Sequence, residues 1–168
     1  MPDEETIERA KRDKRQGKAP STQAGEFIRG EFEHIREGKH GARSTKQAIA
    51  IGLSKARRAG VDLPPPKKGA VPEKTRRSAE SAYRAGHEGG HATSPTRARA
   101  AKRALQREPE AVASHAALAK QARSSAGRRT HSERSAAARK AVRTKGPTAR
   151  SAAARKAART RAARHASS

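Results

Sequence analysis

The sequence predicts a mostly α-helical chain with extensive disorder, built from a small helical head and a basic tail of short helices that form on binding. Its 168 residues hold 40 Lys and Arg against 16 Asp and Glu, which gives a formal net charge of +24, and aromatic residues make up only 2%. A low content of large apolar residues combined with a high net charge is typical of disordered chains. Large apolar residues recur at helical spacing only near the N-terminus, which places the one expected core there.

The first two expected helices cover residues 3–15 and 21–38. The first has acidic residues in its first turn and basic residues in its last, an order that suits the helix dipole. In the second, Ile28, Phe32 and Ile35 follow the i, i+4, i+7 spacing of an apolar helical face. We expect Ser21 or Thr22 to cap the start of this helix, and Gly38 to end it.

A third helix is predicted from the Ser44-x-x-Gln47 pattern, which is the sequence form of a capping box. Gly60 and Val61 fit a helix end at which Val61 folds back on the last turn. These helices give a core that is very small for a domain, so we expect it to be completed by self-association through the head or by a ligand. The expected core residues are Phe27, Ile28, Phe32, Ile35, Ile49, Ile51 and Leu53.

Three segments of the head carry a family resemblance: STQAGEF (21–27), IREGKHGARSTKQAIAIGLSKARRAGV (35–61) and LPPP (63–66). In them the chain resembles a family of small uncharacterised bacterial proteins, in which a domain of unknown function precedes an Ala/Arg/Lys-rich tail. The resemblance covers roughly residues 5–66. It implies a bacterial, cytoplasmic protein and supplies neither an activity nor site residues.

A proline-rich linker separates the head from the tail. We expect a head at 1–62, a linker at 63–72 and a tail at 73–168, because the three prolines at 64–66 favour an extended spacer. Residues 1–66 carry a net charge of +4, and residues 67–168 carry +20. Short helices are expected in the tail at 73–85, at 96–107 and from Pro109 to about Arg123.

A tandem repeat dominates the end of the tail. Residues 134–144 return as residues 150–160, and the two copies differ only in Val142 against Ala158. Gly146 and Pro147 lie between them, and we expect these two residues to separate two cationic helical rods. A GC-rich genome also inflates Ala and Arg, but drift alone does not readily produce a near-identical repeat in register.

We expect the tail to bind nucleic acid, because strongly asymmetric basic charge usually indicates a polyanionic partner. The prediction is sequence-nonspecific binding to double-stranded DNA by a nucleoid-associated, histone-like protein. The tail lacks the aromatic platforms that single-stranded RNA recognition uses, and its Ala/Lys/Arg composition resembles bacterial linker-histone-like tails. The sequence Ser94-Pro95-Thr96-Arg97 fits a turn seen in linker-histone tails, but a plain helix cap is the favoured interpretation of it. The cations expected to contact phosphates are Arg134, Arg139, Lys140, Arg143, Arg150, Arg155, Lys156 and Arg159.

Two other binding functions stay open from the sequence. The first is an RNA- or ribosome-associated basic protein. The second is a protein-interaction module in which the helix at 44–60 binds a partner while the tail binds a polyanion. Without cysteine, a long apolar run or an apolar N-terminal segment, the sequence predicts a cytoplasmic location (the bacterial nucleoid) and neither a membrane span nor secretion.

Enzymatic activity is not expected, and we assign no catalytic residue, cofactor or metal ligand. His87-Glu88-Gly89-Gly90-His91 matches the zinc-protease pattern, but two adjacent glycines disfavour the helix that this chemistry needs. Adventitious metal binding by His87 and His91 is the remaining alternative to a solvated loop. The other histidines show no spacing with Ser or Asp that suggests a catalytic triad: His34, His40, His115, His131 and His165.

Overall fold

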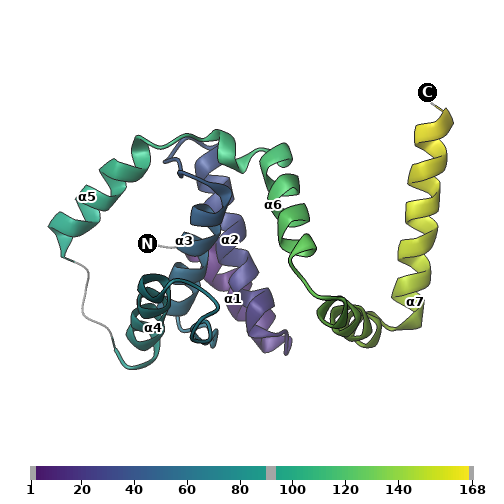
Figure 1. The fold of residues 1–168 in the computed structure, drawn as a ribbon, viewed down its shortest axis with the longest axis horizontal. Coiled ribbons are helices and arrows are strands. Elements are labelled where there is room, and N and C mark those ends of the chain that lie inside the picture. The colour runs from purple at the N-terminus through teal and green to yellow at the C-terminus, as the bar shows by residue number, and fades with distance from the viewer. Residues whose placement is uncertain (1–2, 90–93, 167–168) are drawn as a thin grey trace. The chain divides into compact units, whose positions relative to one another are not determined.

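The computed structural model describes residues 3–89 and 94–166, and in that part the regular structure is entirely helical (Figure 1). The chain divides into two compact units, Met1–Gln121 and Ala122–Ser168. The helices are α1 (Glu4–Arg15), α2 (Pro20–Arg36), α3 (Thr45–Arg58), α4 (Glu73–His87), α5 (Pro95–Gln106), a 3-10 turn η1 (Ala111–Ala113), α6 (His115–Gly127) and α7 (His131–Ala166).

The helical fold class is confirmed, but the expectation of extensive disorder, with tail helices that form only on binding, is not supported. Helices occupy most of the described tail as well as the head. Alanine is the best helix former, and it dominates the tandem repeat. The like-charge pair Arg139 and Arg143 opposes the helix by only about 0.2–0.5 kcal/mol. Composition reports a shortage of large apolar residues for a core, but it does not report how readily each segment forms a helix. It therefore predicted disorder in a tail that is helical.

The helices α1 to α5 begin and end close to the expected residues. α2 begins at Pro20, which occupies the first helical turn, so neither Ser21 nor Thr22 is its cap. α3 is capped as predicted: the Ser44 hydroxyl accepts a hydrogen bond from the Gln47 amide, and the Gln47 side chain accepts one from the Arg43 amide. The predicted helix end at Gly60 is also present, since the Val61 amide donates to the Ala56 carbonyl at 3.1 Å.

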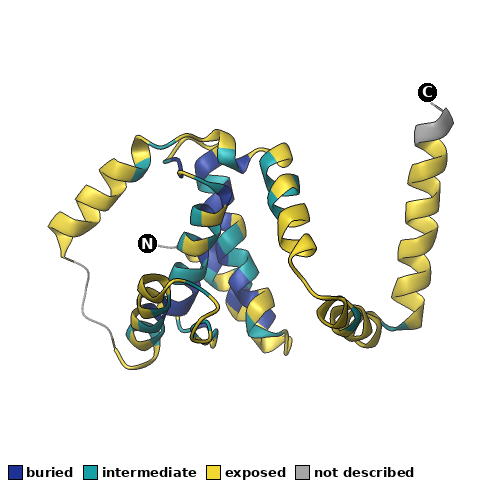
Figure 2. Cartoon of the chain, viewed as in Figure 1, coloured by how far each residue is buried: buried dark blue, intermediate teal, exposed yellow. Residues whose placement is uncertain are grey.

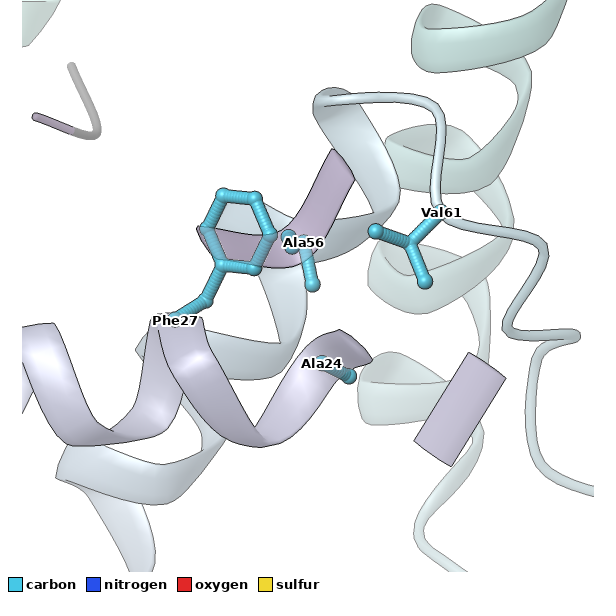
Figure 3. Close-up of a cluster of buried hydrophobic side chains, with 5 residues drawn as sticks. Ala24, Phe27, Ala56 and Val61 are labelled. Atoms are coloured by element: carbon cyan, nitrogen blue, oxygen red, sulfur yellow. The ribbon is translucent and has the colours of Figure 1, made fainter. Parts of the chain in front are cut away.

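One core cluster joins α1, α2 and α3. Figure 3 shows Ala24 and Phe27 of α2 facing Ala56 of α3, with Val61 on the loop that follows α3. Ala10 of α1 completes this buried cluster. Four of its five buried members are Ala or Val, so the helices approach closely and bury little area per side chain.

A second core cluster draws on residues that we expected in the tail. Phe32, Ile35, Ala42 and Ala48 pack with Ala113 of η1, and Leu118 of α6 lies against them. This segment is tied to the loop that precedes α3 by backbone hydrogen bonds and by the Thr45 hydroxyl, which donates to the Val112 carbonyl at 3.0 Å. The helix expected from Pro109 is instead a 3-10 turn followed by α6.

The expected core residues are distributed between these two clusters. Phe27, Phe32 and Ile35 are buried, and Ile28, Ile49 and Leu53 are half-buried against the clusters. Ile51 belongs to neither cluster and lines an open cavity. Figure 2 shows burial concentrated in α1, α2 and α3 and their surroundings, whereas α5 and the described side chains of α7 are largely exposed.

α4 packs against α3 and belongs to the first unit. Ala79 and Ala82 are buried, and the Tyr83 hydroxyl donates to Asp62 at 2.7 Å. The first compact unit therefore extends through Gln121. The division into a head at 1–62, a linker at 63–72 and a tail at 73–168 stays a prediction, because it concerns which segments fold on their own.

Glycines make the close helix crossings possible. A Cβ atom added to Gly52 would lie 2.8 Å from the Ile28 Cα atom, and one added to Gly86 would lie 2.0 Å from the Arg57 carbonyl oxygen. Both neighbours are backbone and cannot move independently of their helix. Gly25, in contrast, has open space around the same position.

Candidate nucleic-acid interface

The two copies of the tandem repeat adopt the same local structure in α7. The Thr144 hydroxyl donates to the Lys140 carbonyl at 2.9 Å, and the Thr160 hydroxyl donates to the Lys156 carbonyl at 3.0 Å. The helix is interrupted at Gly146, which has φ 66° and ψ 172° and is followed by Pro147. The predicted pair of rods separated by a Gly-Pro break is therefore present (Figure 1).

Three cations of each copy form a stripe along one side of its rod. At about 100° per residue, Arg139, Lys140 and Arg143 lie within roughly 100° of arc, and they are all exposed. We call these residues the first stripe and their equivalents the second stripe, which consists of Arg155, Lys156 and Arg159.

The two remaining predicted cations lie away from the stripes. Arg134 and Arg150 are also exposed, but each precedes the first member of its stripe by five residues and so lies about 140° around the helix from it. The Arg134 guanidinium donates to the Arg129 carbonyl at 3.1 Å. The structure thus groups six of the eight predicted cations into two equivalent sets and leaves these two outside.

The charge of the rods is not neutralised by acidic side chains of the same segment. Residues 134–168 contain no Asp or Glu. In the first unit, by contrast, cations stabilise the fold: Arg9 lies 2.8 Å from Glu26 and 3.7 Å from Glu33, and Lys55 lies 2.5 Å from Glu31. Because the stripe cations face water, they can reach an external anion without breaking a contact with a carboxylate of their own rod.

A capping box that we did not predict starts the first rod. The Thr130 amide donates to the Glu133 carboxylate at 2.8 Å, and the Glu133 amide donates to the Thr130 hydroxyl at 3.2 Å. The backbone hydrogen bond from Thr130, followed by the bond from its side chain, lowers the pKa of Glu133. The Thr-x-x-Glu spacing was visible in the sequence and is the signal for this cap.

The His87–His91 motif does not continue as a helix over its described part. α4 ends at His87, Glu88 is its C-cap, and Gly89 has φ 76°. The His87 ring stacks on Tyr83, with 4.0 Å between ring centroids, and its Nδ1 donates to the Tyr83 carbonyl. His91 lies outside the described residues, so adventitious binding by this pair stays a prediction.

The structure brings together a glutamate and two histidines for which we predicted no role. Glu31, His34 and His40 each present one ligand atom, and these atoms lie within 4.8 Å of one another. Glu31 and His34 are three residues apart on α2, a spacing that places both on one helical face. The three-residue spacing of Glu31 and His34 was visible in the sequence, but the position of His40 beside them depends on the turn after α2.

Within the described residues, none of the helices combines the length and the apolar character that crossing a bilayer requires. Comparisons of the chain with curated proteins and with solved structures find no match. Comparison with protein families matches residues 3–68, which are 66 of the 168 residues and include α1, α2 and α3. The resemblance to an uncharacterised family is confirmed: over residues 3–68 the chain carries the domain described as family of unknown function (DUF6496).

Proposed function

We propose that this protein binds double-stranded DNA without sequence specificity, as a nucleoid-associated, histone-like protein of the cytoplasm. The observation that carries the proposal is the pair of equivalent, exposed three-cation stripes on α7, in a segment without acidic side chains. Such an arrangement suits a regularly spaced polyanion and offers nothing that reads base edges.

The proposed contacts are made with phosphate oxygens. Each stripe contains two arginines, whose planar guanidinium groups can bond a phosphate through two parallel hydrogen bonds, and one lysine, which acts as a point charge. Each phosphate that is neutralised releases about 0.9 condensed counterion on duplex DNA. Six contacts therefore give a slope of about −5 for the logarithm of affinity against the logarithm of salt concentration.

The break at Gly146 lets both stripes engage one duplex. The copies are sixteen residues apart, so in an unbroken helix the second stripe would be rotated by about 160° from the first, at about 100° per residue. A straight rod would then present its stripes on nearly opposite sides. Because Gly146 and Pro147 interrupt the helix, the direction in which the second stripe faces is not fixed by the first stripe through the helical period.

The test replaces the six stripe cations with glutamine and measures duplex affinity by fluorescence anisotropy as salt is varied. The matched control replaces six exposed cations of the first unit, which lowers the net charge from +24 to +18 in the same way: Arg12, Lys14, Arg15, Lys46, Lys67 and Lys68. We expect the stripe variant to lose most of the affinity and about five units of slope, and the control to retain the slope. Equal losses in both variants would show that net charge alone is responsible and would contradict the proposal.

The same assay separates DNA from RNA as the ligand. The wild-type protein is bound to labelled duplex DNA and challenged with unlabelled duplex DNA or with duplex RNA of equal length. We expect duplex DNA to compete at least as well as duplex RNA. Displacement by RNA at much lower concentrations would overturn the choice of DNA while leaving the phosphate contacts intact.

A further inference from the structure

The end of α2 and the turn after it bring three potential metal ligands together. Glu31 and His34 lie on one face of α2. The chain then reverses: the Gly38 amide donates to the Ile35 carbonyl at 3.1 Å, and the Lys39 amide donates to the His34 carbonyl at 3.0 Å. This turn returns His40 to the same face, where the three ligand atoms lie within 4.8 Å of one another.

One oxygen of this group lacks a partner. The Glu31 side chain is 0% exposed, and its Oε2 atom accepts a hydrogen bond from Lys55 at 2.5 Å. Its Oε1 atom is buried without a hydrogen-bond partner and lies 3.5 Å from His40 Nε2. A buried acceptor without a partner is unfavourable, and more so when it is charged, so the site favours a cation at this oxygen.

The hydrogen bonds of the two histidines leave a nitrogen free on each ring. His40 Nδ1 lies 3.0 Å from the Gly41 carbonyl, which can only accept, so this nitrogen carries the proton and the neutral ring has its lone pair on Nε2. His34 Nε2 bonds the Asp3 carboxylate, which leaves its Nδ1 as the available nitrogen. Metal-binding histidines typically donate their other N–H to a carbonyl or a carboxylate in this way.

We propose that Glu31, His34 and His40 bind one divalent transition-metal cation of the zinc class. Two imidazoles and one carboxylate suit Zn²⁺ or Co²⁺ rather than Mg²⁺ or Ca²⁺, which prefer oxygen ligands. The bound cation supplies a partner to Glu31 Oε1 and links α2 to the loop that precedes α3. All three residues line one open cavity, which gives an ion access from solvent.

Lys55 sets an upper limit on the affinity of this site. Its ammonium group lies 2.5 Å from Glu31 Oε2, so it holds the carboxylate in place and also repels a second cation. The site is independent of the stripes on α7, and its failure would leave the proposed DNA binding unaffected.

The first test is a calorimetric titration of the full-length, metal-free protein with Zn²⁺, together with the visible absorption spectrum after addition of Co²⁺. We expect one equivalent to bind and the melting temperature to rise. The double variant His34→Gln, His40→Gln should abolish this binding, whereas the control His115→Gln, His131→Gln should retain it. The variant Asp3→Asn, which removes an orienting partner, should weaken binding by about 10–100-fold.

A measurement on the wild-type protein keeps the proposal testable if the double variant does not fold. On addition of one equivalent of Zn²⁺, the side-chain NMR signals of His34 and His40 should shift, while those of His115 and His131 stay in place. The variant His87→Gln, His91→Gln should still bind one equivalent. Loss of binding in that variant, unchanged His34 and His40 signals, or only weak binding without a fixed stoichiometry would overturn the proposal.

Discussion

Removing the break in α7 should halve the number of phosphate contacts without removing a cation. The perturbation is the double variant Gly146→Ala, Pro147→Ala, because alanine disfavours the φ of 66° at position 146 and favours a continuous helix. In that helix the two stripes face about 160° apart. A duplex can then contact three cations instead of six, so the salt slope should change from about −5 to about −3.

The assay is fluorescence anisotropy on a short labelled duplex at several NaCl concentrations, with circular dichroism to confirm the gain in helix. Gly127→Ala is the control for the glycine substitution, since it replaces a glycine with alanine at the end of α6, where the added methyl group meets nothing within 4 Å. The control should retain a slope of about −5. A double variant that gains helix and still shows the wild-type slope would refute the role of the break.

Three further predictions concern the fold. In urea denaturation, Gly52→Ala should lower the free energy of unfolding by about 1–3 kcal/mol because its methyl group meets the backbone of α2. Gly25→Ala, which has open space at the same position, should raise it by about 0.5–1 kcal/mol. Equal effects of the two substitutions would contradict the close contact between Gly52 and α2. The Asp62 carboxylate accepts a hydrogen bond from the Tyr83 hydroxyl and raises the pKa of Tyr83 above 10.0, so this bond stabilises the fold below pH 10 and is lost as the pH rises through the raised value. Ultraviolet titration of this single tyrosine should show the raised pKa and its return toward 10.0 in Asp62→Asn. The pKa of Glu133 should lie below 4.5 by NMR, and the stabilisation that its cap gives to the first rod should be present above pH 4.5 and disappear as the pH falls through the lowered value.

Local signals predicted α1, α2 and α3 well because their ends are set by short-range chemistry. The capping box at Ser44 and the helix end at Gly60 each involve residues within six positions of one another. The apolar spacing identified most of the core for the same reason, since Phe32 and Ile35 lie on the face that a helix must bury.

The contribution of the region after the linker to the first unit could not be predicted from local signals. Ala113 and Ala82 are small residues in a polar context, and nothing in their neighbourhood distinguishes them from other alanines. They are buried because η1 and α4 pack against helices far away in the sequence. Alanine-rich chains therefore conceal packing surfaces that larger apolar residues would reveal.

The two candidate sites also differ in whether local sequence signals reveal them. The stripes could be predicted because exposed cations on a helix need only the helical period and the repeat. The group of Glu31, His34 and His40 depends on the turn at Gly38 and on the burial of Glu31, neither of which a spacing rule supplies. The zinc-protease pattern drew attention to His87 instead, where the helix ends.

The most direct test of the DNA-binding proposal is amide hydrogen exchange of the full chain with and without duplex DNA, at a salt concentration where binding is saturated. The proposal predicts that DNA slows exchange in residues 134–144 and 150–160, to a similar extent in both, and leaves α2 and α3 unchanged. Slower exchange confined to α2 and α3, with both repeat copies unaffected, would contradict the claim that the stripes of α7 hold the nucleic acid.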